Sequence, residues 1–335
     1  MLEALLDIKP LWYENSDCFE SIIASVADWK GYNYEMIFTQ SWGFGIDEEN
    51  PDYPGLLGWR IHSGKGRIAP VLREFHRIEF VMQRAVNFGE LMNIILNELN
   101  KGLPIAIEVD IYNCPWQNDY QKIHNSHFVL VVGMDNATCS LICVDTMPPK
   151  NNVSLPVDFL QDKLVMCGIF NYLPAESSPL DARPVLREVT AKVLGHKGYY
   201  NNFGDEFGPK NNFETMRLFA MFVRENMNLR DEVYGYDQSN LNMAPIIWRL
   251  KNIGWNRKLF TKSLEYMSRI TPQLDFSGSI EQLNHAALLW DWVSNLLWKS
   301  ALSGNLSNNN VKIADKIMQA ADLEEEIAYM FTEMC

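Results

Sequence analysis

The sequence predicts an α+β protein, with a sheet-forming first half and a mainly helical second half. Three observations support this. A helix-like stretch with a cysteine in its first turn starts after Asp17, and continuous apolar runs typical of buried strands lie at 104–111, 127–134 and 139–145. Beyond about residue 180 the apolar residues recur mostly at helical spacing. We therefore expect two domains, residues 1–175 and 181–335, with a Pro- and Ser-containing linker between them.

Composition excludes several classes of function. The chain has 335 residues, a formal net charge of −13 and a pI near 5.0, which argues against non-specific binding to nucleic acid or an anionic membrane. The start of the sequence lacks signal-peptide features and no stretch approaches the ~20 apolar residues of a membrane span, so we expect a soluble, cytoplasmic protein. The six cysteines form no CxxC pair, which speaks against a disulfide framework or a structural zinc site.

The stretch from Asp17 to Gly31 is predicted to be a helix with Cys18 at its first position. Asp17 is a suitable N-cap, Glu20 completes a capping box and Gly31 is a natural stop. The unpaired N–H groups and the dipole at a helix start favour a thiolate and an oxyanion. The alternative is that Cys18 is a small buried hydrophobe. The predicted apolar face consists of Ile22, Ile23, Val26 and Trp29.

The remaining elements follow from spacing and turn residues. Residues 32–60 resemble a loop in composition, and their glycines could line a pocket. Residues 60–84 are locally basic, either as a solvated face or as a docking patch for an acidic partner formed by Arg60, Lys65, Arg67, Arg73 and Arg77. Helices are expected at Phe88–Asn100 and 155–164, and a further strand at 165–172. Expected helices of the second half lie at 185–195, 212–229, 239–252, 256–270, 278–300 and 309–332.

Cysteine chemistry needs a base and a group that orients that base. His127 heads one strand and Asp145 ends the next, so an antiparallel hairpin would bring them to the same end of the sheet. Cysteine, histidine and aspartate in this chain order are expected of a papain-like fold. The alternatives are a strand-end histidine bonded to backbone and a turn aspartate. A metal pair of His124 and His127 lacks a third ligand, so no metal site is predicted.

Several runs resemble one family, butirosin biosynthesis protein H. They are the segment Asp17–Ala24, the segment Val109–Trp116, the residues Tyr120 and His124, and the segment His127–Asp135. The resemblance covers about residues 10–175, and the helical half is similar to the domain that usually follows in this family. The segment Asn113–Trp116 departs from the more apolar and aromatic run expected there.

The resemblance implies a papain-like acyltransferase with no bound cofactor. Family members take an acyl group from the phosphopantetheine thioester of a carrier protein and pass it to an amine, in the founding case on an aminoglycoside antibiotic. By position, Cys18 is the nucleophile, His127 the base and Asp145 its orienter. The resemblance assigns no oxyanion side chain, and Asn15 is a separate candidate for that role. The expected partners are an acyl or peptidyl carrier protein and an amine-bearing small molecule or peptide. A cysteine hydrolase and a non-catalytic binding protein remain the alternatives.

Overall fold

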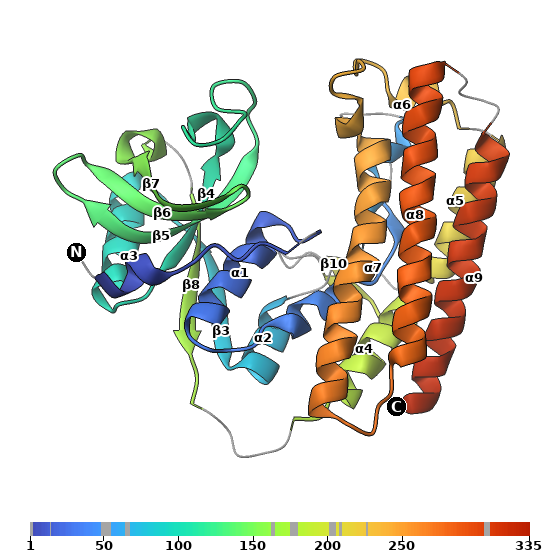
Figure 1. Cartoon of the computed structure of the whole chain (residues 1–335), viewed down its shortest axis with the longest axis horizontal. Helices are drawn as coiled ribbons and strands as arrows, with labels where there is room; N and C mark the ends of the chain where they lie inside the picture. The colour runs from blue at the N-terminus through green and yellow to red at the C-terminus, as the bar shows by residue number, and fades with distance from the viewer. Residues whose placement is uncertain are drawn as a thin grey trace. The chain divides into compact units, whose positions relative to one another are not determined.

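Two units make up the chain, and the sequence passes between them three times. The computed structural model describes residues 3–13, 15–47, 55–63, 68–161, 165–174, 180–200, 206–207, 210–225, 227–304 and 309–335. Unit 1 contains Met1–Ile37 and Ala69–Ser177, and unit 2 contains Phe38–Ile68 and Ser178–Cys335 (Figure 1). The predicted fold class, an antiparallel sheet with an early helix followed by a mainly helical region, is confirmed.

Unit 1 is built on a six-stranded antiparallel sheet with the strand order β3-β8-β4-β5-β6-β7. Four of these strands were expected, and the predicted hairpin of the second and third apolar runs is confirmed as β5 and β6. In chain order the strands are β3 (Ile78–Arg84), β4 (Ile105–Asp110), β5 (Ser126–Asp135), β6 (Ser140–Thr146), β7 (Pro149–Pro156) and β8 (Met166–Tyr172).

The helix expected at 155–164 is wrong. Leu155 lies in β7, which pairs with β6, and a 3-10 turn, η5 (Val157–Leu160), follows it. Residues 162–164 lie outside the described part of the chain. Val157 and Leu160 are both buried, so the apolar spacing that looked helical belongs to the end of a strand and a short turn.

Two helices of unit 1 have the predicted ends. Helix α1 (Cys18–Trp29) packs against β5 and β6, and its capping box is formed as expected from Asp17 and Glu20. Helix α3 (Phe88–Asn100) is confirmed, and Gly31 and Gly102 follow the two helices with φ of 73° each, a conformation that glycine adopts without strain. The basic stretch was not predicted to be regular, but it contains α2 (Ile68–His76) and β3.

Unit 2 is mainly helical, and its three longest helices lie side by side (Figure 1). The two helices expected at 239–252 and 256–270 form a single helix, α7. Gly254 lies inside this helix. A Cβ at this position would lie 3.0 Å from Trp290 Cβ on the neighbouring helix, so glycine allows the two helices to pack closely. The helices are α4 (Arg183–Val193), α5 (Asn212–Glu225), α6 (Leu229–Glu232), α7 (Pro245–Ile270), α8 (Ser277–Ser303) and α9 (Asn310–Met334). Two short strand pairs complete it, β1 (Gly45–Ile46) with β2 (Ile61–His62) and β9 (Tyr199–Tyr200) with β10 (Glu206–Phe207).

Described residues of the segment 38–68 lie in the core of unit 2, although the composition of residues 32–60 predicted a loop. Trp42 and Phe44 are 0% and 1% exposed and stack on Phe260 and Trp290. Gly58 allows a close approach of backbone to the start of α7 at Ile246. The segment also holds two 3-10 turns, most of η2 (Glu35–Ser41) and all of η3 (Leu57–Trp59). Among the described residues, no helix combines the length and the apolar character that a bilayer span requires.

Candidate active site

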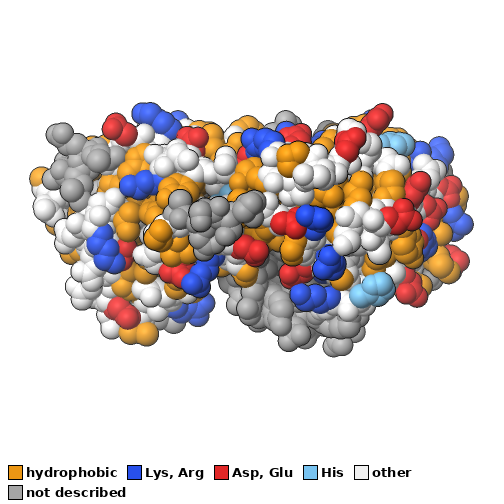
Figure 2. Space-filling view, turned by 90° about the horizontal axis from the view of Figure 1, so that it is seen from below, with side chains coloured by type: hydrophobic (Ala, Val, Ile, Leu, Met, Phe, Trp, Pro, Cys, Tyr) orange, Lys and Arg blue, Asp and Glu red, His pale blue; other side chains and the backbone are white. Residues whose placement is uncertain are grey.

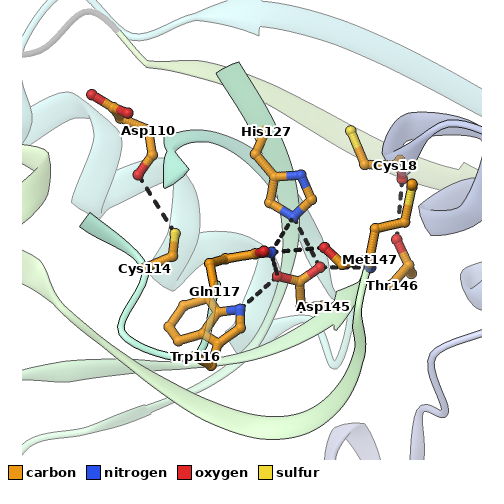
Figure 3. A network of polar contacts seen from close by, with 9 residues as sticks. All are labelled: Cys18, Asp110, Cys114, Trp116, Gln117, His127, Asp145, Thr146 and Met147. Atoms are coloured by element: carbon orange, nitrogen blue, oxygen red, sulfur yellow. Dashed lines mark hydrogen bonds and ion pairs between the residues drawn. The ribbon is translucent and has the colours of Figure 1, made fainter. Parts of the chain in front are cut away.

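Three elements of unit 1 bring the predicted catalytic residues together. Cys18 is the first residue of α1, His127 the second residue of β5, and Asp145 the last but one of β6. Because β5 and β6 are antiparallel neighbours, the start of one strand lies beside the end of the other. Figure 3 shows the imidazole of His127 between the side chains of Asp145 and Cys18.

Asp145 is fully buried and surrounded by N–H donors. Its Oδ1 lies 2.9 Å from His127 Nε2 and accepts from the backbone N–H of Met147 at 2.9 Å. Its Oδ2 accepts from Trp116 Nε1 at 2.5 Å and from Gln117 Nε2 at 2.8 Å. A buried carboxylate needs such partners, and they fix its orientation. Since an ionised carboxylate only accepts hydrogen bonds, Nε2 of His127 carries the proton in this contact.

The surroundings of His127 favour the protonated, positively charged form of its imidazole. Burial alone lowers the pKa of its imidazole, but hydrogen bonds to Asp145 and Cys18, together with the charges of both groups, raise it to about 9. Its side chain is 8% exposed, so these interactions act where water screens them weakly. Cys18 is half-buried at the helix start, and its carbonyl oxygen accepts from Thr146 Oγ1 at 3.4 Å.

This arrangement meets the requirements of covalent acyl chemistry. A thiol at a helix start lies next to an imidazole, and a buried carboxylate fixes the tautomer of that imidazole. Unpaired N–H groups at the start of a helix such as α1 are suited to hold an oxyanion. The sequence therefore predicted three residues that the fold brings into contact.

The other cysteines show the contrast with Cys18. Burial raises the pKa of the Cys167 thiol to about 12 and that of Cys143 well above the ordinary value. Cys114 is also buried, and its Sγ lies 3.6 Å from the Asp110 carbonyl oxygen. Cys143 is buried, whereas Cys139 is exposed. Buried thiols of this kind are poor nucleophiles.

Asn15, the candidate oxyanion donor, lies in the turn before α1. Its backbone has φ of 79°, a left-handed conformation that asparagine tolerates better than most residues. Its side chain is half-buried, three residues before Cys18. The assignment of Asn15 as an oxyanion donor stays a prediction.

Three of the five candidate docking residues lie among the described residues, and they are divided between the two units. Lys65 and Arg67 lie outside the described residues. Arg60 belongs to unit 2, where its Nε donates to the Asp47 carbonyl oxygen at 2.9 Å. In unit 1, Arg73 is exposed and pairs with Glu79 at 3.4 Å, and Arg77 is half-buried. On the face drawn in Figure 2, basic side chains are interspersed with acidic and apolar ones. The docking patch stays a prediction.

His124 has a partner other than His127. Its Nδ1 lies 2.7 Å from Asp110 Oδ2, and its ring stacks on Tyr112 with centroids 4.1 Å apart. In the described part of the chain, no group of three or more His, Cys, Asp or Glu side chains is placed to hold a metal ion. His124 therefore belongs to a local contact with Asp110 in the loop between β4 and β5.

Sequence reasoning missed Trp116 and Gln117. Both lie in the loop between β4 and β5, and both contact the carboxylate of Asp145. The loop has no apolar periodicity, so nothing in its pattern indicated where its side chains point. The one available signal was a tryptophan in an otherwise polar loop directly before the strand that carries His127.

Comparison with known protein families gives a match to the part of the chain that holds this site. The family model described as butirosin biosynthesis protein H, N-terminal, matches residues 17–146. The match runs from the N-cap of α1 to the end of β6, so it contains Cys18, His127 and Asp145. No curated protein is similar enough in sequence to match the chain. Residues 17–146 of this chain are therefore similar to the amino-terminal part of butirosin biosynthesis protein H.

Proposed function

We propose that this protein is a cysteine acyltransferase of natural-product biosynthesis. It takes an acyl or aminoacyl group from the phosphopantetheine thioester of a carrier protein and transfers it to an amine of a small molecule or peptide. The observation that carries the proposal is the contact of His127 with both Cys18 and Asp145, in a domain whose family is named for a biosynthetic protein. The helical unit 2 has no assigned role in this chemistry.

The proposed reaction has two half-reactions through an acyl-enzyme. The Cys18 thiolate attacks the thioester carbonyl carbon, and the tetrahedral oxyanion is held by N–H groups at the start of α1. Collapse breaks the bond to the pantetheine sulfur, which takes the proton of the His127 imidazolium. The acceptor amine then attacks the acyl-enzyme, neutral His127 takes a proton from the amine nitrogen, and Cys18 leaves as the amide forms.

Intact-protein mass spectrometry tests the first half-reaction. The protein is mixed with an acyl thioester of pantetheine, and the expected result is a mass increase equal to the acyl group, mapped to Cys18 by peptide analysis. Cys18→Ala should give no adduct, and Cys139→Ala, at an exposed cysteine outside the site, should acylate as the wild type does. Acylation spread evenly over the cysteines would contradict the proposal.

Adding amines to the isolated acyl-enzyme separates transfer from hydrolysis. A transferase loses the acyl group faster as the amine concentration rises and yields the amide. A rate that does not depend on the amine, with the free acid as product, would identify a cysteine hydrolase instead. The balance between these outcomes depends on how well the acyl-enzyme excludes water.

Docking of the carrier protein to the basic stretch is a separate part of the proposal. Arg73 and Arg77 are its described members in unit 1, the unit that holds the site. Reversing both charges should raise the KM for a carrier-bound donor severalfold and leave the KM for a free pantetheine donor unchanged, because only the carrier contributes a charged protein surface. Equal changes with both donors would contradict docking at these residues.

A further inference from the structure

Gln117 has a defined place beside the catalytic carboxylate. Its side-chain nitrogen donates to Asp145 Oδ2 at 2.8 Å and to the Met147 carbonyl oxygen at 2.7 Å. Both partners are acceptors, so the amide nitrogen, and not the amide oxygen, must face them. The same nitrogen lies 3.3 Å from His127 Nε2, which places Gln117 at the contact between the base and its orienter (Figure 3).

The loop that carries Gln117 is tied at its base. Asp110 Oδ1 accepts from the backbone N–H of Tyr112 at 3.1 Å and of Asn125 at 3.2 Å, and its Oδ2 lies 2.7 Å from His124 Nδ1. One carboxylate thus joins the beginning and the end of the loop. Because the loop is held at both ends, its residues Trp116 and Gln117 contact Asp145 with little freedom to move.

We propose that Gln117 is a positioning residue for acyl transfer, and that with Trp116 it holds the Asp145 carboxylate against His127 Nε2. The inference rests on the proposed function of Cys18 and His127. Trp116 and Gln117 are the two donors to Oδ2, whereas Met147 N and His127 share Oδ1.

The physical reason is that Asp145 can orient the imidazole of His127 only while the Asp145 carboxylate is itself held in one orientation. Asp145 is 0% exposed, so water does not replace a lost donor. Without the donors from the loop, Oδ2 would be a buried acceptor without partners, and rotation of the carboxylate towards other N–H groups would relieve that cost. Such a rotation moves Oδ1 away from Nε2 and weakens the interaction that raises the pKa of His127.

The test measures the charge of His127 through the reactivity of Cys18. The ratio of alkylation rates with anionic iodoacetate and neutral iodoacetamide is high while the imidazolium is present and falls as His127 loses its proton. In the wild type the fall should occur near pH 9. In Gln117→Leu we expect the midpoint to move down towards the ordinary histidine value of 6.5. We also expect at least a tenfold loss of kcat with an unchanged KM.

Two further variants distinguish positioning from a general structural effect. Trp116→Phe removes only the indole N–H donor and should shift the same midpoint in the same direction. Gln121→Leu makes the matched substitution in the same loop, where the side-chain nitrogen contacts Tyr120 Oη, and should leave the midpoint at the wild-type value. A wild-type midpoint in Gln117→Leu, or an equal shift in Gln121→Leu, would overturn the inference. If the wild type itself shows no high-ratio state, the proposed function fails instead.

Discussion

At the scale of single residues, the charge of His127 depends on its two neighbours. Hydrogen bonds and charges from Asp145 and Cys18 outweigh the effect of burial and raise its pKa to about 9. Cys18→Ser keeps the size of the side chain but removes the ionisable thiol, so we predict a lower His127 pKa in this variant. Histidine NMR titration of the two proteins measures it. An unchanged His127 pKa would show that Cys18 does not interact with the imidazole.

His76 is predicted to make the protein sensitive to acid. It is buried, its Nε2 accepts from the Met36 backbone N–H at 3.0 Å, and burial lowers its pKa to about 4. Between pH 6.5 and 4 the unfolded chain therefore binds a proton that the folded chain does not, so stability is lost as the pH falls through this window. The loss is up to about 3 kcal/mol.

His76→Gln tests this linkage, because glutamine accepts the same hydrogen bond without titrating. Urea unfolding at pH 5.0 and 7.5 should give a smaller difference in the free energy of unfolding for this variant than for the wild type. His285→Gln, at an exposed histidine, is the matched control and should keep the wild-type difference. A wild-type pH difference in His76→Gln would rule out His76 as the group responsible.

Cys18, His127 and Asp145 could be predicted as candidates because each stands at the start or end of an element that the sequence pattern predicts. Cys18 follows a cap residue, and the other two residues stand at the ends of apolar runs that had to be strands. Trp116 and Gln117 were not predictable in the same way. Their direction is set by the bonds of Asp110 to the loop backbone, which depend on the folded loop and leave no periodic trace in the sequence.

At the scale of secondary structure elements, the start of α1 both places Cys18 and depends on one side chain. Asp17 Oδ1 accepts from the Glu20 backbone N–H at 2.8 Å, and the Asp17 N–H donates to Glu20 Oε2 at 3.1 Å. Asp17→Ala removes the cap, so we predict a loss of about 1 kcal/mol in the free energy of unfolding. Cys18 alkylation should also slow, because the first turn frays.

Asp28→Ala is the control for the cap, since Asp28 is exposed in the last turn of the same helix. Urea unfolding and iodoacetamide alkylation of both variants should separate the two positions. A full wild-type stability in Asp17→Ala would show that α1 is fixed by its packing against β5 and β6 alone.

Helices and strands were predicted well where a single run of apolar residues, with its flanking cap or turn residues, corresponds to a single element. The limits of α3 and the hairpin of β5 and β6 followed from cap residues and apolar runs. Two failures had a tertiary cause. The sequence predicted two helices where α7 runs unbroken through Gly254, at which α8 approaches closely, and it predicted a helix at Leu155, which pairs with β6 and is part of β7.

At the scale of the whole molecule, the order of the chain does not follow the order of the two units. Residues 38–68 lie between two parts of unit 1 in the sequence, yet they belong to unit 2. Composition could not reveal this. An insert rich in aromatic residues and glycine has the same composition whether it lines a pocket or forms part of the core of another unit. Trp42 illustrates the outcome, being fully buried among Phe213, Phe260 and Phe331.

Glu324 joins four segments of unit 2. Its carboxylate accepts from Arg257 of α7 at 2.7 Å, from Trp42 Nε1 at 2.9 Å and from Trp290 Nε1 of α8 at 3.1 Å, while Arg257 also donates to the Gly43 carbonyl oxygen at 2.7 Å. Arg257 and Glu324 are each 0% exposed. Glu324→Gln leaves the arginine charge buried without its counter-ion, so we predict a loss of about 3–5 kcal/mol in the free energy of unfolding.

Hydrogen exchange and urea unfolding locate this loss. Faster exchange in Glu324→Gln should appear in α7, α8, α9 and the segment around Trp42, because the carboxylate holds these four together. Glu326→Gln, an exposed position on the same helix, should behave as the wild type. Wild-type stability in Glu324→Gln would mean that packing of the aromatic side chains alone holds residues 38–68 in unit 2. The loss that we predict would instead show that the buried carboxylate of Glu324, together with the aromatic packing, holds the segment around Trp42 in the helical unit.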